Sequence, residues 1–183
     1  MQRFSSDVYR ERLARAAVLT GDAGLDGIVV STGPDLRYLT GSRANTFERL
    51  TALVIPAAGS PRLVVARLEL ASLAESAVGE LDIEVADWVD GQDPYALALA
   101  ALPVDPVIAV SDAMPALHVI PLAERTGGTP ALATAVLREL RMIKDPAEIE
   151  HFTQFVALRM DKKGTLFRMD DGELSAELAK LDD

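Results

Sequence analysis

The sequence predicts an α/β domain in which a mixed β-sheet is flanked by helices. Short apolar runs rich in β-branched residues, typical of buried strands, recur along the chain and alternate with amphipathic helical segments. In addition, two apolar runs are joined by a four-residue loop that contains Gly59. A loop of this length indicates an antiparallel hairpin, so the sheet is expected to be mixed rather than wholly parallel.

The first half of the chain opens with a helix that Ser6 or Asp7 can cap and that extends to about Thr20. A buried strand is expected at 27–31, because its apolar run is continuous and β-branched. The elements that follow are a short helical turn at 35–41, hairpin strands at 51–56 and 61–66, a helix at about 68–78 and a half-exposed or edge strand at 82–88.

In the second half, a strand at 107–111 is expected among helices at 94–102, 115–125 and 131–140. The clearest helix start lies further on, where Asp145 can serve as N-cap, Pro146 as the first helical residue and Glu148 as the reciprocal partner in a capping box. One helical face then carries Ile149, Phe152 and Val156, and a last short helix is expected at about 172–181. The sequence therefore predicts a domain over 1–144, followed by a linker helix and a short helical tail over 145–183.

Composition restricts the classes of function. A net charge of −10 argues against a nucleic-acid-binding or anionic-membrane surface, which would need clustered Lys and Arg. The absence of cysteine excludes disulfides, thiolate metal sites and a cysteine nucleophile. No apolar run approaches the ~18–20 residues of a membrane span, and the start does not resemble a signal peptide. The expected location is the cytoplasm.

No complete catalytic or metal-binding set is apparent. The two histidines, His118 and His151, lie in no HExxH or other ligand-spaced cluster, and a structural His118 and a solvated or interface His151 are favoured over ligands. Walker-type, dinucleotide-binding and nucleophile-elbow motifs are absent. A receiver-like domain with Asp112 as phospho-acceptor would need further acidic residues at the end of its first strand and a lysine after its fifth. The sequence excludes this class, because the first strand ends in Ser31 and Thr32 and no lysine precedes Lys144. The loop at 31–35 is favoured as a simple turn over an anion site.

The segment 35–41 combines an aromatic ring with charges between two strands. Polar and aromatic side chains at the carboxyl end of a strand can form a pocket. The alternative is that Tyr38 and Leu39 close the end of the sheet while the charged side chains face water. If the segment binds substrate, the candidates are Arg37, Tyr38 and Arg43, since arginine suits a peptide carboxylate.

Two segments carry a family resemblance. The sequence of 35–41, Asp-Leu-Arg-Tyr-Leu-Thr-Gly, resembles the Asn-x-x-Tyr-Leu-Ser/Thr-Gly signature in the N-terminal domain of the creatinase, prolidase and aminopeptidase P family. The sequence of 140–149, Leu-Arg-Met-Ile-Lys-Asp-Pro-Ala-Glu-Ile, is similar to the junction that precedes the family's catalytic domain. The resemblance spans roughly 7–150, and the two motifs stand in the family's order about one domain apart.

The resemblance implies a ribonuclease H-like α/β domain that pairs subunits and shapes access to a neighbouring active site for short Xaa-Pro peptides. In the family, a following metallopeptidase domain holds two ions, usually manganese, cobalt or zinc, on two aspartates, a histidine and two glutamates. Only 34 residues follow Ile149 here, and none matches a family metal ligand. No catalytic residue, metal ligand or cofactor is therefore expected in this chain.

The sequence thus favours a non-catalytic accessory domain of a Xaa-Pro dipeptidase-like protein, inactive alone, with a homodimer or a catalytic domain as partner. Two alternatives stay open. The chain can be a fragment of a complete metal-dependent Xaa-Pro peptidase, or a free-standing module that binds a small ligand or a protein.

Overall fold

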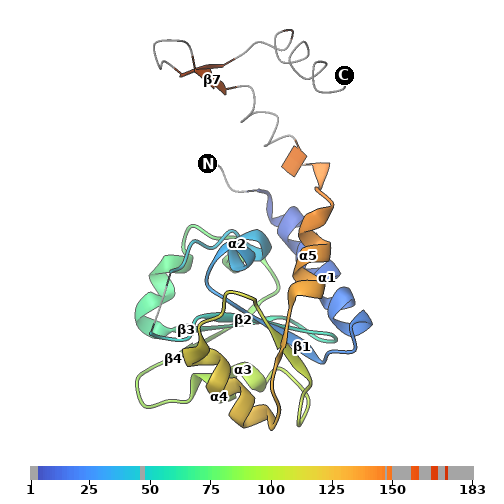
Figure 1. The fold of residues 1–183 in the computed structure, drawn as a ribbon. Coiled ribbons are helices and arrows are strands. Elements are labelled where there is room, and N and C mark those ends of the chain that lie inside the picture. The colour runs from blue at the N-terminus through green and yellow to red at the C-terminus, as the bar shows by residue number, and fades with distance from the viewer. Residues whose placement is uncertain are drawn as a thin grey trace. The chain divides into compact units, whose positions relative to one another are not determined.

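The structure is a computed structural model that describes residues 4–45, 48–146, 148–149, 158–160, 166–168 and 172 (Figure 1). The chain divides into two compact units, Met1–Met142 and Ile143–Asp183. The boundary predicted after Lys144 lies two residues beyond this division. The first unit is built on a six-stranded sheet with the order β4-β3-β2-β1-β5-β6, so the predicted α/β fold class is confirmed.

One strand of this sheet runs against all the others. The strands are β1 Gly27–Ser31, β2 Ala52–Pro56, β3 Arg62–Ala66, β4 Glu84–Trp88, β5 Ile108–Val110 and β6 Ala131–Leu132. Strand β2 is antiparallel to both β1 and β3, whereas the pairs β1–β5, β3–β4 and β5–β6 are parallel. The short loop between β2 and β3 reverses the chain as predicted, while the parallel pairs need longer crossovers.

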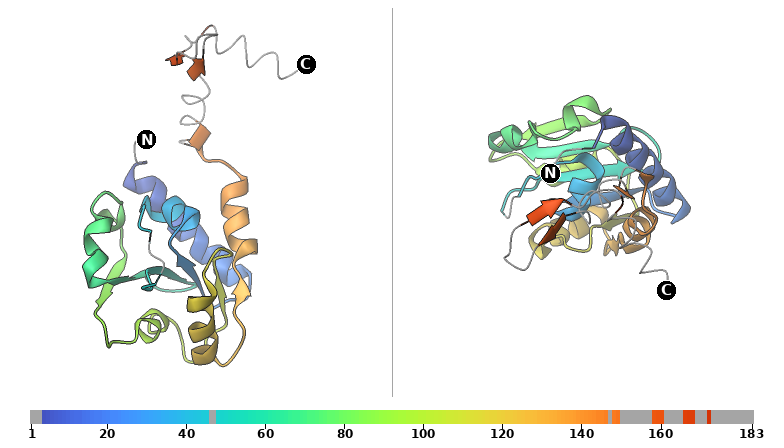
Figure 2. Two further views of the ribbon diagram at one scale, coloured as in Figure 1. Left: turned by 60° about the vertical axis from the view of Figure 1, so that its left-hand side comes forward. Right: turned by 90° about the horizontal axis from the view of Figure 1, so that it is seen from above.

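Helices cover both faces of the sheet. They are α1 Ser6–Asp22, α2 Pro34–Thr40, α3 Pro94–Leu99, α4 Ala116–Thr126 and α5 Thr134–Met142, with 3₁₀ helices η1 Arg67–Leu73 and η2 Val78–Glu80. Apolar residues of α1, α2 and α5 pack in one core layer and those of α3 and α4 in the other. Figures 1 and 2 show these two helical layers on opposite sides of the sheet.

Alternation along each strand supplies both layers. In β2, Leu53 and Ile55 belong to the layer under α1, α2 and α5, whereas Ala52 and Val54 belong to the layer under α3 and α4. All four side chains are fully buried. Because both faces of the sheet are covered, the central strands read in the sequence as continuous apolar runs rather than as alternating ones.

The structure corrects three details of the predicted elements. The first helix takes Ser5 as N-cap rather than Ser6 or Asp7. The helix expected at 68–78 is two 3₁₀ helices, because the N–H of Ala77 donates to the carbonyl of Thr40 at 2.8 Å instead of continuing a helix. The helix expected from 131 begins at Thr134, since Ala131 and the next residue pair with β5 as strand β6.

In the second unit, the predicted helix start is confirmed. The N–H of Glu148 donates to Asp145 Oδ1 at 2.8 Å, and the N–H of Asp145 donates to Glu148 Oε2 at 3.1 Å, which is the reciprocal capping box. Strands β7 Leu158–Met160 and β8 Leu166–Arg168 pair antiparallel, which the sequence did not predict. The helical face with Phe152 and Val156, and the last helix apart from Gly172, lie outside the described residues.

Across the described residues, no helix is both long and apolar enough to cross a membrane.

Candidate functional site

The segment singled out in the sequence forms helix α2, directly after the buried strand β1. Pro34 occupies the first helical turn, where its missing N–H removes no hydrogen bond, and Gly41 ends the helix in a left-handed conformation with a φ of 73°. Between them, Leu36 and Leu39 are fully buried in the core layer shared with α1 and α5. The apolar positions of the segment therefore close the core, as one of the two hypotheses from the sequence proposed.

Tyr38 is half-buried and contacts two other helices. Its hydroxyl donates a hydrogen bond to the carbonyl of Leu140 in α5 at 2.9 Å. The guanidinium of Arg12, in α1, lies 4.0 Å from the centroid of the tyrosine ring, and Nη1 donates to the Tyr38 carbonyl at 2.9 Å. The phenol therefore holds the three helices of this layer together.

The two arginine candidates differ from Tyr38 in exposure. Arg37 and Arg43 are both exposed, one on α2 and the other just after it. Nearby, Asp35 in the first turn of α2 forms an ion pair with Arg141 of α5 at 2.8 Å. A role for Arg37, Tyr38 or Arg43 in substrate binding stays a prediction.

The described part of the chain holds no group of three or more His, Asp or Glu side chains that could bind a metal ion. His118 is only 3% exposed, and its Nδ1 lies 3.0 Å from the hydroxyl of Tyr95. Burial lowers the pKa of His118, which favours the neutral ring. The structural role predicted for His118 fits this environment, and His151 lies outside the described residues.

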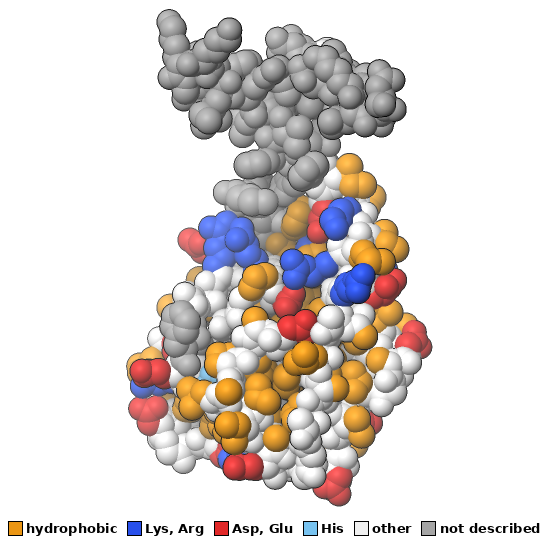
Figure 3. All heavy atoms as spheres, viewed as in Figure 1, with side chains coloured by type: hydrophobic (Ala, Val, Ile, Leu, Met, Phe, Trp, Pro, Cys, Tyr) orange, Lys and Arg blue, Asp and Glu red, His pale blue; other side chains and the backbone are white. Residues whose placement is uncertain are grey.

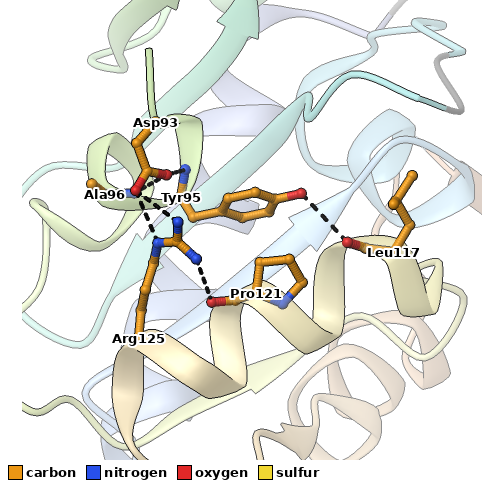
Figure 4. A network of polar contacts seen from close by, with 6 residues as sticks. All are labelled: Asp93, Tyr95, Ala96, Leu117, Pro121 and Arg125. Atoms are coloured by element: carbon orange, nitrogen blue, oxygen red, sulfur yellow. Dashed lines mark hydrogen bonds and ion pairs between the residues drawn. The ribbon is translucent and has the colours of Figure 1, made fainter. Parts of the chain in front are cut away.

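A polar network that the sequence did not predict links α3 and α4 (Figure 4). Asp93 is the N-cap of α3, where its Oδ1 accepts hydrogen bonds from the N–H groups of Tyr95 and Ala96 at 3.0 and 3.2 Å. Its Oδ2 accepts from Arg125 of α4 at 2.8 Å, and Arg125 also donates to the carbonyl of Pro121. The sequence held a signal for the cap, since Asp-Pro precedes the helix, but none for the arginine 32 residues away.

The network sets the ionisation of its members. Partial burial acts to raise the pKa of Asp93, but the hydrogen bond and charge of Arg125 and the two N–H groups outweigh it and hold the pKa below its ordinary value. Burial raises the pKa of Tyr95. The arrangement therefore favours a charged carboxylate beside a neutral phenol, which stabilises the contact between the helices and offers no activated nucleophile.

One surface of the first unit is poor in charged residues. Helix α4 connects the neighbouring strands β5 and β6. The stretch 113–123, which includes most of α4, and the stretch 126–137, which includes β6, contain no Asp, Glu, Lys or Arg. We call the exposed apolar residues of these stretches the α4–β6 surface: Ala113, Pro115, Ala116, Leu117, Ile120, Ala131, Leu132 and Ala135. Figure 3 shows hydrophobic side chains gathered over α4.

The opposite edge of the sheet is different. On β4, Glu84 pairs with Arg62 of β3 at 2.8 Å, and Asp87 pairs with Arg67. Charged side chains on an edge strand oppose pairing with another chain. Leu132 on β6, by contrast, is 62% exposed and has no charged neighbour within four residues along the chain. The two edges of the sheet are therefore not equally protected from association.

Comparisons with known proteins agree with this fold. Residues 12–143 match the family described as Creatinase/Prolidase N-terminal domain. A probable dipeptidase PepE of Mycobacterium tuberculosis H37Rv is 59% identical over 150 residues, which cover 81% of this chain and 40% of that protein. The chain thus spans about 40% of the length of the curated relatives that it matches.

Solved structures give the same result. The crystal structure of dipeptidase PepE from Mycobacterium ulcerans superposes with a TM-score of 0.79 at 57% identity, over 83% of this chain and 41% of that one. A dipeptidase from Pyrococcus horikoshii OT3 gives 0.66 at 31%, over 78% and 40%. A proline dipeptidase chain from Streptococcus pneumoniae TIGR4 gives 0.61 at 26% identity, over 72% of this chain and 98% of that one.

The fold and these matches define a class of protein, a mixed-sheet α/β domain that corresponds to the N-terminal part of longer dipeptidases. More particularly, the chain belongs to the creatinase/prolidase N-terminal domain family.

Proposed function

We propose that this domain is the non-catalytic N-terminal part of a Xaa-Pro dipeptidase-like protein, and that it serves subunit assembly and shapes access to a neighbouring active site. The observation that carries the proposal is its relation to dipeptidases of which it spans only 40%. The lack of a metal-binding group in the described residues fits this division of labour, because a dinuclear hydrolase needs a cage of carboxylates and imidazole. The manganese, cobalt or zinc ions of such an enzyme would belong to the catalytic domain.

The α4–β6 surface supports the assembly role. A chain with a net charge of −10 repels its own copies, so that a face poor in charged residues is a favourable place for two copies to meet. Most homodimers have two-fold symmetry, and an edge strand that pairs with its own copy about a two-fold axis runs antiparallel to it. The exposed and uncharged strand β6 allows such pairing, while the ion-paired strand β4 opposes it.

The assembly role is tested by the mass of the purified chain in solution, measured by sedimentation or light scattering over a range of concentrations. We expect a dimer that weakens in Leu132→Glu, because the change places like charges opposite each other across the contact. The matched control is Val104→Glu, which alters a residue that is 90% exposed and lies outside the surface. A wild-type chain that stays monomeric, or equal weakening by both variants, would contradict assembly through this surface.

The non-catalytic role is tested separately. The purified chain is supplied with manganese or cobalt and an Xaa-Pro dipeptide, and free proline and bound metal are measured. We expect neither turnover nor stoichiometric metal. Turnover with tightly bound metal would refute the accessory role, and would require a site built from residues that carry no metal-binding geometry in the described part of the chain.

A further inference from the structure

The C-terminal turn of α5 receives two polar contacts from α2. The last four carbonyls of a helix have no partner within it, and Leu140 provides one of them in α5. This carbonyl accepts the hydrogen bond from the hydroxyl of Tyr38 at 2.9 Å. Its neighbour Arg141 forms the ion pair with Asp35 at 2.8 Å. Contacts from two turns of α2 therefore meet on one turn of α5.

Packing alone does not explain how this turn is held. Leu140 is buried, but Met142 is 56% exposed and Ile143 is 59% exposed. Beyond Leu140 the apolar side chains therefore contribute little burial that would keep the helix from fraying. The polar contacts with α2 act just where the hydrophobic contacts end.

Arg12 in turn fixes the position of Tyr38. Arg12 is only 5% exposed, and it contacts both the ring and the carbonyl of Tyr38. The same guanidinium lies 4.7 Å from the ring centroid of Phe4 and 5.7 Å from that of Tyr9. A buried charge is costly to move away from its partners, so Arg12 fixes the phenol in the orientation that reaches α5.

We propose that Tyr38 and Asp35 form a clamp that holds the last turn of α5 and so fixes the point at which the first unit ends. Tyr38 is a positioning residue in this arrangement, because it acts through the backbone of Leu140. The clamp is independent of the proposed assembly role, since it lies on the face of the sheet covered by α1, α2 and α5. It also gives a physical role to the 35–41 segment that needs no substrate.

The test is amide hydrogen exchange of the full chain, resolved by peptide or by residue. Tyr38→Phe removes the hydroxyl and keeps the ring against Arg12, so the domain remains folded. Loss of a hydrogen bond of ordinary net strength should make amide exchange in 139–142 about 2- to 13-fold faster than in the wild type. Amide exchange in strand β2 should not change, because amides in the centre of the sheet exchange only when a larger part of the domain unfolds.

The matched control is Tyr95→Phe, which removes a hydroxyl that is bonded at the other face of the sheet. It leaves exchange in 139–142 unchanged. A second variant, Asp35→Asn, removes the charge that pairs with Arg141 and raises exchange in the same stretch, with an effect that shrinks at high salt. The proposal is overturned if Tyr38→Phe leaves 139–142 as protected as in the wild type, or if it accelerates exchange equally throughout the first unit.

Discussion

Asp93 makes two contacts that can be separated by substitution. Its Oδ1 caps α3 through the N–H groups of Tyr95 and Ala96, and its Oδ2 pairs with Arg125 of α4. Asparagine keeps an oxygen that caps a helix about as well as aspartate does, but it carries no charge. Alanine removes both the cap and the charge. Comparison of the two variants therefore assigns a free energy to each contact.

The magnitudes follow from the geometry. Loss of an N-cap costs about 0.5–2 kcal/mol of unfolding free energy. The side chains of Asp93 and Arg125 are 42% and 34% exposed, so their ion pair contributes about 0.2–1 kcal/mol after solvent screening. We expect Asp93→Asn to destabilise by about 0.2–1 kcal/mol and Asp93→Ala by about 1–3 kcal/mol. The control Asp90→Ala, at a side chain that is 78% exposed in a 3.5 Å pair, should cost under about 0.5 kcal/mol.

Urea unfolding at pH 7 measures these differences, and a pH series checks the sign. A carboxyl whose pKa is lowered in the folded state stabilises the protein above its unfolded pKa, and that contribution is lost as the pH falls through the lowered value. The difference in unfolding free energy between the wild type and Asp93→Asn should therefore shrink as the pH falls through the lowered pKa of Asp93. If Asp93→Ala costs no more than Asp90→Ala, the reasoning about the network is wrong.

Three further predictions concern the core, the glycines and metal ions. Ile55→Ala, at a fully buried position, should lower the unfolding free energy by about 2–5 kcal/mol in urea unfolding, whereas Val104→Ala stays within about 0.5 kcal/mol. Gly27→Ala places a Cβ 2.5 Å from Leu102 Cδ2, the end of a partly buried side chain that can shift, and should cost at most about 1 kcal/mol. Gly79→Ala meets nothing within 4 Å and should be neutral or stabilising by up to about 1 kcal/mol. Removal of metal by chelation should leave the melting temperature unchanged.

Local patterns predicted strands β1 to β5 and most helices, but not β6, β7 or β8. Strand β1 was predicted with the bounds that the structure gives it, and the capping box at Asp145 was found as expected. Both depend on signals within a few residues: a β-branched run in one case and a cap, a proline and a glutamate in the other. Strand β6 was missed, because its two residues are held by pairing with β5 and the alanine-rich sequence around them favours a helix.

The candidate site shows the same limit. The sequence identified the 35–41 segment as unusual, and two hypotheses for Tyr38 stayed open. Only the structure brings its hydroxyl to Leu140, which is 102 residues away, and its ring to Arg12. A contact at such a separation leaves no periodic trace in a single sequence.

The sequence by itself determined the class of the domain, its membership of the family by two motifs, and the expectation that no catalytic set is present. These properties depend on hydrophobic pattern, on local helix signals and on which residue types occur at all. The tertiary structure decided the roles of single residues: Tyr38 as the contact to α5, Asp93 as the link between α3 and α4, and β6 as the uncharged edge. The physical reason is that these roles arise from contacts between distant segments, which form only when both faces of the sheet are covered.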